Sequence, residues 1–310
     1  MNLLIIDRFP VAFLDQLAAL PVQFNYQPEI KRPEVLELIS DIDILIMNSK
    51  VKVDQELADK ANRLKLVLRA GVGMDHIDME YLASKGIVAQ NTAGANADSV
   101  GEQTVGMLLT LRHHLIRANA QVKQFDWQRE QNRAAELTQK TIGIIGYGNT
   151  GKAVAKRLAG FEAELLVYDK YVSDFGHDHI KEVSLEEIYE RADVLSFHVP
   201  LTSETREWVH DDLIERMAKP FMLLNLARGP IVNLDALARG LKTGKITAAA
   251  LDVLPNEKMH KLSSAERSVL SELFEYENVI FAPHIGGWSH ESLRNINNRL
   301  VAYVKELLEG

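Results

Sequence analysis

The chain has 310 residues, of which 46% are apolar and 25% charged, and its formal net charge is −8. This length suffices for two domains, and the negative charge argues against a general nucleic-acid-binding protein. The chain has no cysteine, which excludes disulfides, cysteine–zinc sites and thiol catalysis. No stretch approaches the roughly 18–20 apolar residues of a membrane helix, and the N-terminus lacks a signal-peptide pattern, so we expect a cytoplasmic protein without a membrane partner.

The N-terminal part alternates between short apolar runs, which predict buried strands, and amphipathic stretches, which predict helices. We expect strands at 3–6, 44–47, 66–68 and 88–89, and helices at 11–20, 33–40, 55–61 and 79–85. This alternation is typical of a parallel sheet that is covered by helices.

A long helical pattern follows at 97–124. At about 28 residues it exceeds a typical helix of a small sheet domain, so we interpret it as one helix that joins two domains. It could also offer the surface of a homodimer, or it could simply be a buried helix. The two histidines on it, His113 and His114, are interpreted as packing or surface residues.

A second alternating series predicts strands at 141–145, 165–168, 194–198, 221–225, 248–252 and 279–282. Ser184 and Glu187 form a capping-box pattern that marks the start of one intervening helix. Six strands with helical crossovers match a doubly wound nucleotide-binding fold. The final amphipathic stretch, 291–308, predicts a helix that returns to the first domain.

The most specific motif is a glycine-rich loop between the strand at 141–145 and the helical stretch at 152–158: Gly146-Tyr147-Gly148-Asn149-Thr150-Gly151. Gly146 permits a tight turn, Gly148 lets the backbone approach a pyrophosphate, and Gly151 lets the helix pack against the strand. The N–H groups at the start of the helix then face the phosphates. The alternative is a set of glycines in an ordinary turn.

Asp169 follows the next strand, about 18 residues after Gly151, where an acid binds the adenosine ribose in dinucleotide-binding domains. A carboxylate there repels a 2′-phosphate, so the sequence favours NAD over NADP. Lys170 weakens this preference, and the alternative is that Asp169 merely ends a strand.

From the two alternating series and the glycine loop together, we expect an α/β protein with two doubly wound parallel-sheet domains. A Rossmann NAD-binding domain, 97–284, is inserted in a discontinuous flavodoxin-like substrate domain made of 1–96 and 285–310.

Three later segments place polar residues after predicted strands. They are Asn225-Leu226-Ala227-Arg228-Gly229, Leu251-Asp252-Val253 with Glu257, and Pro283-His284-Ile285-Gly286-Gly287. With the glycine loop, and in this order, they resemble the D-isomer-specific 2-hydroxyacid dehydrogenase family. The resemblance also covers 69–75, 91–102 and 197–202, so it spans nearly the whole chain.

The resemblance implies an NAD-dependent oxidoreductase that acts on a small 2-hydroxy or 2-keto acid. Arg228 would bind the substrate carboxylate as a planar fork and polarise the carbonyl group. His284 would donate or accept the proton, and Glu257 would orient its ring and favour its protonated form. Each could instead be structural, and Lys258 stands where the family usually has proline after this glutamate.

The remaining roles are carried over position by position. Asp252 and the Ala227 carbonyl would bind the nicotinamide carboxamide, and Gly286 would lie beside the nicotinamide. His198, Val199, Pro200 and Thr205 would line the cofactor site. Val72 and Gly73 would bind the substrate carboxylate through backbone N–H groups. Asp75, His76 and Asp78 look like a metal cluster, but the resemblance makes them loop-fixing residues, so no metal is expected.

Ser49 and Arg69 resemble the substrate segment of D-3-phosphoglycerate dehydrogenases. Asn48 stands where those enzymes commonly have arginine, and Lys50 or Lys52 would replace that contact. D-3-phosphoglycerate is the first substrate expected, glyoxylate or hydroxypyruvate the second, and D-lactate less favoured; Glu257 argues against formate. Because the chain ends at Gly310, without the serine-sensing domain of longer members, feedback by serine is not expected.

The alternative from another class is an NAD-sensing corepressor-like binding protein. Trp288 could shape the substrate pocket or a domain interface.

Overall fold

The computed structural model describes residues 1–309 and divides the chain into two compact units. Unit 1 comprises Met1–Asn96 and the segment that starts at His290, and unit 2 is Ala97–Ser289. The second boundary therefore lies five residues beyond the predicted one at 284/285. The reason is local hydrogen bonding within unit 2: the backbone N–H groups of Ile285 and Gly286 donate to the Asp252 carboxylate, and Ser99 donates to the Gly286 carbonyl.

Unit 1 is a five-stranded, all-parallel sheet with the order β2-β1-β3-β4-β5 and helices on both faces. This order is the flavodoxin-like one. The strands are β1 (Asn2–Ile5), β2 (Gln23–Tyr26), β3 (Ile44–Met47), β4 (Leu66–Arg69) and β5 (Val88–Asn91). The helices are α1 (Val11–Ala18), α2 (Arg32–Leu38), η1 (Ile39–Asp41), α3 (Gln55–Lys60), α4 (Met79–Ser84) and α12 (His290–Glu309).

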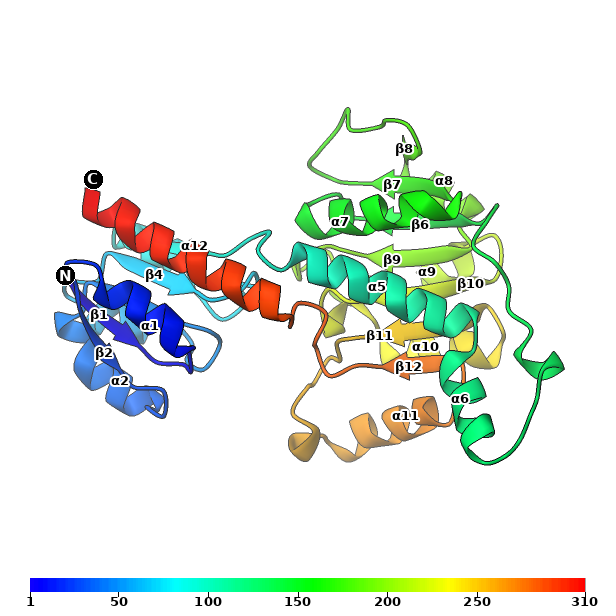
Figure 1. The fold of residues 1–310 in the computed structure, drawn as a ribbon, viewed down its shortest axis with the longest axis horizontal. Helices are drawn as coiled ribbons and strands as arrows, with labels where there is room; N and C mark the ends of the chain where they lie inside the picture. Colours follow the sequence, from blue (N-terminus) through cyan, green and yellow to red (C-terminus); the bar gives the residue numbers. More distant parts are fainter. Residues whose placement is uncertain (310) are drawn as a thin grey trace. The chain divides into compact units, whose positions relative to one another are not determined.

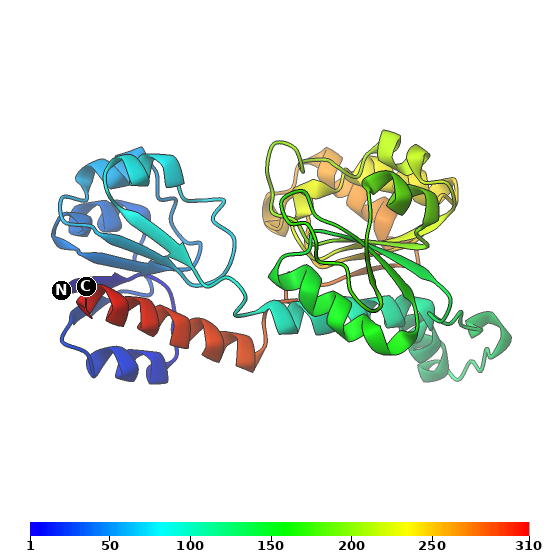
Figure 2. The same ribbon diagram turned by 90° about the horizontal axis from the view of Figure 1, so that it is seen from above.

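Alternate residues of the central strands of unit 1 face two separate cores. Leu3 and Ile44 pack with Phe13 of α1 and Leu300 of α12. Leu45, on the other face, packs against α2, α3 and α4. Because both faces are covered, β3 is apolar throughout and β1 is apolar after Asn2. The figures show α1 and α12 on one side of the sheet (Figures 1 and 2).

Unit 2 is a seven-stranded, all-parallel sheet with the order β12-β11-β10-β9-β6-β7-β8. Counted from β6, the first six strands have the Rossmann order, with β12 added at the edge. The strands are β6 (Thr141–Ile145), β7 (Glu164–Tyr168), β8 (Ile180–Glu182), β9 (Val194–Phe197), β10 (Phe221–Asn225), β11 (Ile246–Leu251) and β12 (Val279–Phe281). The sequence-based prediction of two doubly wound parallel-sheet domains is confirmed.

Helices cover both faces of the unit 2 sheet. The first face carries α5 (Ala97–Arg112) and α7 (Asn149–Leu158), and the second carries α8 (Leu185–Arg191), α9 (Asp211–Arg216), α10 (Leu234–Lys242) and α11 (Ser264–Phe274) (Figures 1 and 2). The remaining elements are α6 (Leu115–Lys123), η2 (Glu130–Asn132), η3 (Ala159–Phe161), η4 (Gly229–Ile231) and η5 (Met259–Lys261). As predicted, the Ser184 hydroxyl caps a helix, α8, by accepting from the Glu187 N–H.

The prediction of one continuous helix at 97–124 is wrong. The chain forms two helices, α5 and α6, with a break at His113 and His114. His114 adopts a left-handed conformation with φ 52°, which ends α5 and redirects the chain into α6. Such a conformation is uncommon for residues other than glycine, although histidine, like asparagine and aspartate, adopts it more often than most. Neither glycine nor proline stands at the break, and the apolar periodicity of the sequence continues through it. The sequence therefore contains no signal that would divide the helix.

No helix within residues 1–309 is both long and apolar enough to span a bilayer.

Candidate functional site

The glycine loop joins β6 to α7 at the carboxyl edge of the unit 2 sheet. Gly146 has φ 98°, and a Cβ there would lie 2.4 Å from the His198 carbonyl oxygen. A Cβ on Gly151 would lie 1.9 Å from the Gly146 carbonyl oxygen, so the start of α7 packs directly on the loop. These contacts admit no side chain at either position.

Gly148 differs, because a Cβ there would meet no protein atom within 4 Å. It is the N-cap of α7, and no side chain caps that helix. The N–H groups of its first turn, which includes Asn149 and Thr150, therefore remain for an anion. The Tyr147 ring is buried and stacks on Phe175 with ring centroids 4.3 Å apart. An open approach, a glycine and an uncapped helix start fit a dinucleotide pyrophosphate.

Asp169, directly after β7, is fixed by backbone groups. One carboxylate oxygen accepts from the Tyr147 N–H at 2.7 Å, and the other accepts from the N–H groups of Tyr171 and Val172 at 2.8 and 3.1 Å. The carboxylate is thereby held beside the glycine loop, where it suits ribose hydroxyls. Lys170, which could have attracted a 2′-phosphate, is paired with Glu204, and this contact raises the pKa of Lys170.

His198 follows β9 and bonds to the glycine-loop strand through its backbone N–H, which donates to Ile145 at 2.7 Å. Its Nε2 lies 2.8 Å from the Ser196 hydroxyl, and burial lowers the pKa of His198 to about 4. The ring is therefore neutral at pH 7. Thr205 is buried, and its hydroxyl donates to the Pro200 carbonyl at 2.7 Å. The structure thus shows Thr205 fixing the loop that carries Val199 and Pro200.

The segment after β10 is locked by Asn225, a fully buried residue to which the sequence analysis assigned no role. Its amide donates to the Arg228 carbonyl at 2.9 Å and accepts from the Ala227 N–H at 3.1 Å. The Arg228 guanidinium donates to the Ala227 carbonyl at 2.7 Å. A Cβ on Gly229 would lie 2.0 Å from the Leu254 carbonyl. The asparagine and the glycine of the N-x-x-R-G pattern therefore set the backbone path that presents Arg228.

Asp252, after β11, holds three consecutive backbone N–H groups. Its carbonyl oxygen accepts from His284 at 2.7 Å, and its two carboxylate oxygens accept from Ile285 at 2.9 Å and Gly286 at 2.8 Å. Burial raises the pKa of Asp252, and the two N–H bonds to its carboxylate oppose this rise. A Cβ on Gly286 would lie 2.9 Å from the same carboxylate, so this position requires a small residue.

His284 and Glu257 form an ion pair when the histidine is protonated. The His284 Nδ1 lies 2.8 Å from the Glu257 Oε1, and each side chain is about half-exposed. His284 has φ 56°, a left-handed conformation that its hydrogen bond to Asp252 maintains. Lys258, in place of the usual proline, donates its N–H to the Asn256 side chain, so a hydrogen bond now shapes this loop.

Unit 1 carries the predicted acid-binding residues at the carboxyl edge of its own sheet. Gly71 has φ 140°, and a Cβ there would lie 1.2 Å from Nη1 of Arg69, so the guanidinium lies directly over this glycine. Val72 is partly exposed, at 37%, and leads into Gly73. Ser49 is exposed and follows β3 at the same edge of the sheet.

Two hydrogen bonds that the sequence analysis did not anticipate hold these loops. Asp7 accepts from the Asn48 N–H at 2.6 Å, and Asn91 donates to the Val72 carbonyl at 2.6 Å. Asp7 lies just after β1, and Asn91 is the last residue of β5. A polar residue at the end of a strand is the sequence signal that could have identified both. His76 bonds to the Asn48 carbonyl at 2.9 Å and Asp78 caps α4. Within residues 1–309, no three histidine, cysteine or acidic side chains are grouped as a metal site.

Comparison with known proteins places the chain in a family. The family described as "D-isomer specific 2-hydroxyacid dehydrogenase, NAD binding domain" matches residues 105–286. A hydroxypyruvate reductase of Thermotoga maritima is 33% identical over 90% of this chain and 89% of its own length. A D-3-phosphoglycerate dehydrogenase of Methanocaldococcus jannaschii is 35% identical over 91% of this chain, which spans 52% of that relative.

The fold comparison agrees. The structure of a D-lactate dehydrogenase from Aquifex aeolicus, complexed with NAD and lactic acid, superposes with a TM-score of 0.87 and 30% identity. The match covers 100% of this chain and 96% of that one. The glycine loop, the open Gly148 and the fixed Asp169 are consistent with NAD as cofactor. The chain is an NAD-dependent oxidoreductase that belongs to the D-isomer-specific 2-hydroxyacid dehydrogenase family.

Proposed function

We propose that the protein interconverts D-3-phosphoglycerate and its 2-keto acid, with Arg228, Glu257 and His284 as the catalytic residues. The observation that carries the catalytic assignment is the 2.8 Å contact between the His284 Nδ1 and Glu257. It orients the imidazole and assigns proton exchange with the substrate to the other ring nitrogen, Nε2. Bound NAD would supply the hydride acceptor for the carbon that bears the hydroxyl group.

Side chains of the protein bind the substrate, transfer the proton and hold the cofactor. Arg228 binds the substrate carboxylate, and its fork geometry fixes the orientation of the reacting carbon. His284 takes the hydroxyl proton during oxidation and returns it to the carbonyl oxygen during reduction. Glu257 stabilises the imidazolium that forms in the first case. We assign the nicotinamide carboxamide to Asp252 and the Ala227 carbonyl, and the adenosine ribose to Asp169.

The proposed substrate depends on unit 1. Arg69 supplies a guanidinium at the carboxyl edge of its sheet, and the adjacent glycine leaves room for it. We propose that Arg69 and Ser49 bind the phosphate, while the N–H groups of Val72 and Gly73 bind the carboxylate. Lys50 donates to the Pro28 carbonyl and Arg69 to the Ala70 carbonyl. We propose Arg69 for the phosphate contact because a planar guanidinium can bind a phosphate through two parallel hydrogen bonds, which an ammonium group cannot form.

Reduction of hydroxypyruvate or glyoxylate is the second candidate. It is favoured by Asn48, which stands where phosphate-binding relatives commonly have arginine, and by the similarity to the Thermotoga hydroxypyruvate reductase over 89% of that protein. NADH oxidation followed at 340 nm with phosphohydroxypyruvate, hydroxypyruvate, glyoxylate and pyruvate separates the two. The proposal expects the highest kcat/KM with phosphohydroxypyruvate and a selective loss of that activity in Arg69→Gln.

A higher kcat/KM with hydroxypyruvate, unaffected by Arg69→Gln, would replace the first candidate by the second. Tight NADH binding without turnover of any of the four acids would instead support the corepressor-like alternative. Pyruvate serves as the reference for a substrate that has neither a phosphate nor a second oxygen substituent.

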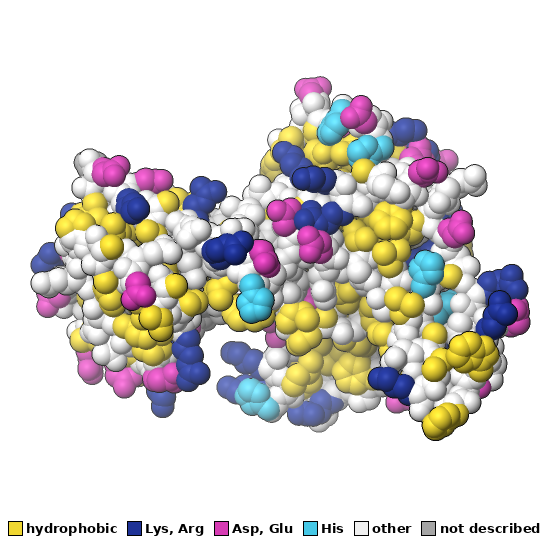
Figure 3. All heavy atoms as spheres, in the orientation of Figure 1, with side chains coloured by type: hydrophobic (Ala, Val, Ile, Leu, Met, Phe, Trp, Pro, Cys, Tyr) yellow, Lys and Arg dark blue, Asp and Glu magenta, His cyan; other side chains and the backbone are white. Residues whose placement is uncertain are grey.

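We also propose that the protein is a homodimer that associates through α6 and the residues after it. Hydrophobic side chains gather over α6 (Figure 3), and Phe125 and Trp127 beyond it are 100% and 75% exposed. Leu115, Ile116 and Val122 are exposed on the helix itself. Exposed apolar side chains normally occur singly on the surface of a soluble protein, whereas these five lie on one helix and the segment directly after it. Light scattering should give a dimer for the wild type and a monomer for the Phe125→Ser/Trp127→Ser variant.

A cytoplasmic location and the lack of a nucleic-acid partner stay predictions, to be checked by cell fractionation and gel-shift assays.

A further inference from the structure

A short turn with several basic side chains follows Glu257 at the carboxyl edge of the unit 2 sheet. Its basic members are Lys258, His260, Lys261 and Arg267. The segment 258–267 contains one acid, Glu266, so its net charge is +2 with the histidine neutral, in a protein whose net charge is −8. Figure 3 shows basic side chains gathered over this turn, which contains η5. Positive charge is therefore concentrated beside one of the proposed catalytic residues.

Hydrogen bonds to the backbone fix the path of this turn. The Lys258 N–H donates to the Asn256 side chain at 3.1 Å, and the Lys261 N–H donates to the Lys258 carbonyl at 2.7 Å. The Arg267 guanidinium, from α11, donates to the Met259 carbonyl at 3.0 Å. None of these bonds uses a lysine side chain, so a change at the two lysine side chains leaves all three in place.

The two lysine side chains are exposed and available to an anion. Within residues 1–309, neither Lys258 nor Lys261 forms an ion pair with an acidic side chain. The one acid of the segment, Glu266, is engaged at the start of α11, where its carboxylate accepts from the Ser263 N–H at 2.7 Å.

The turn lies close to the proposed proton carrier. Glu257 contacts His284 at 2.8 Å, and Lys258 is the next residue, with consecutive Cα atoms about 3.8 Å apart. Lys261 lies one 3₁₀ turn further along the chain, which adds about 6 Å. The backbone of both lysines is therefore within about 10 Å of Glu257, which equals the screening length in roughly 0.1 M salt. Charges at this separation still act on an anion that approaches His284.

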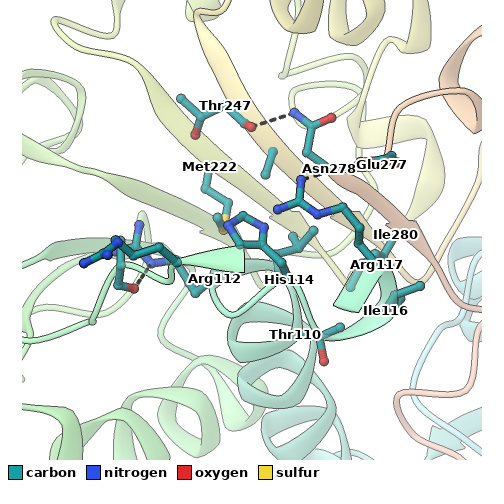
Figure 4. A pocket seen from close by; sticks show the side chains of 14 residues that line it. Thr110, Arg112, His114, Ile116, Arg117, Met222, Thr247, Glu277, Asn278 and Ile280 are labelled. Carbon is teal, nitrogen blue, oxygen red and sulfur yellow. Dashed lines mark hydrogen bonds and ion pairs between the residues drawn. The ribbon is translucent and has the colours of Figure 1, made fainter. Parts of the chain in front are cut away.

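The cations at the opposite edge of the sheet differ in their surroundings. Figure 4 shows the pocket at the amino ends of β10, β11 and β12, which adjoins α6 and therefore the proposed dimer surface. There, Arg117 lies 3.5 Å from the Glu277 carboxylate, and Arg133 pairs with Glu130. Because α11 runs from the carboxyl edge to the amino edge, the basic turn lies at its start and this pocket lies beyond its end. The basic turn is thus separate from the proposed dimer surface.

We propose that Lys258 and Lys261 select substrates by charge and attract 2-keto acids that have a second anionic group, a phosphate or a second carboxylate. This selection rests on the proposed function, in which Glu257 and His284 are catalytic. Arg228 binds the first carboxylate through direct hydrogen bonds, whereas the lysines act at longer range on the total charge of the ligand. Attraction of this kind grows with the charge of the ligand and falls with ionic strength.

The test uses two unreactive ligands of nearly equal shape, oxamate with one negative charge and oxalate with two. Their inhibition constants (Ki) are measured with NADH against the best of the four keto acids, at ionic strengths of about 10 mM and about 0.5 M. At roughly 10 Å in water, removing one positive charge weakens the attraction of one negative charge about twofold. Lys258→Gln/Lys261→Gln should therefore raise the Ki about threefold for oxamate and about tenfold for oxalate at the low ionic strength. At the high ionic strength neither Ki should change, and kcat should stay the same throughout.

Two control variants accompany this one. Lys242→Gln/Lys245→Gln makes the same charge change at the amino edge of the sheet, where α10 ends and β11 begins, and both Ki values should stay at the wild-type level. Lys258→Arg/Lys261→Arg keeps both charges and should be inhibited as the wild type is. Thermal melts check that each variant is folded.

Three results would overturn the proposal. Equal changes in the two glutamine variants would reflect only net charge. A ratio of the oxalate Ki to the oxamate Ki that Lys258→Gln/Lys261→Gln leaves unchanged at low ionic strength would exclude selection by charge. A lower kcat at both ionic strengths would mean that the turn acts on Glu257 and His284 instead of the ligand. Turnover of glyoxylate without turnover of phosphohydroxypyruvate would refute the proposed substrate and would leave this test intact, because the two inhibitors report on charge alone.

Discussion

Replacing Gly148 by alanine should weaken NADH binding while leaving the protein folded. A Cβ at this position meets no protein atom within 4 Å, so the folded chain has room for the methyl group. The same space is where the backbone of the loop must approach the pyrophosphate. The loss should therefore appear in cofactor binding and not in stability.

The expected magnitude follows from the size of the added group. Forcing one extra methyl group into a filled site typically costs about 1–3 kcal/mol. This range corresponds to a roughly 5–150-fold increase in the Kd for NADH. The free energy of unfolding should change by less than about 1 kcal/mol, because Gly148 is an N-cap without a side-chain hydrogen bond.

The assay is NADH fluorescence titration combined with thermal melts, with two glycine variants for comparison. Gly151→Ala places its Cβ 1.9 Å from the Gly146 carbonyl, so it should destabilise the fold itself. Gly160→Ala adds a Cβ in open space away from the loop and should change neither property. An unchanged Kd in a folded Gly148→Ala protein would refute the assignment of this loop to the pyrophosphate.

Four further predictions concern other residues of the site. His284→Ala should reduce kcat by roughly 10²–10⁴-fold with NADH binding intact; normal turnover would exclude it as the proton carrier. Arg228→Lys should be poorly active because an ammonium group cannot form the two-pronged contact, and near-normal kinetics would assign the carboxylate elsewhere. Asp169→Ala should relax discrimination against NADP, and an unaltered ratio of kcat/KM for NADH and NADPH would contradict its role. His198 has a pKa of about 4 in the folded protein against 6.5 ordinarily, so below pH 6.5 the unfolded chain binds the proton more strongly and stability falls. Urea unfolding at pH 7 and pH 5 should show a loss of about 2 kcal/mol that His198→Gln lacks; equal losses would show that the histidine is not buried neutral.

The central strands were predictable because both faces of each sheet are covered. Residues 44–47 form β3, an uninterrupted apolar run that is buried throughout. Two of the four edge strands, β2 and β8, were not predicted. β2 reads Gln-Phe-Asn-Tyr and β8 reads Ile-Lys-Glu, and only one side of each is paired and partly buried. Their polar residues follow from that exposure, which local hydrophobicity cannot distinguish from a loop.

The break at His114 shows a different limit. A left-handed residue other than glycine is maintained by contacts that form only in the folded chain. Here Arg112, at the end of α5, donates to two carbonyl groups more than 20 residues later in the chain. Local periodicity contains no information about these partners, so the two helices were predicted as one.

The candidate site was predictable where side chains carry the chemistry and not where they fix the backbone. The glycine loop and the residues Arg228, Glu257 and His284 were identified from ordered motifs, and the structure places Glu257 beside His284. Asn225 and Asp7 were assigned no role, since each bonds to backbone groups whose positions depend on loop closure.

Asp252 holds the backbone of His284 and of the two residues after it from within unit 2. The proposed proton carrier, His284, is therefore positioned by a residue that directly follows β11, and these three bonds involve no loop of unit 1. If the unit 1 loops bind the substrate as proposed, mutations in them would change which acid is recognised and would leave the proposed catalytic residues in place. Substrate range and reaction chemistry are thus free to evolve at different rates in one chain, as the differently named relatives at about one-third identity illustrate.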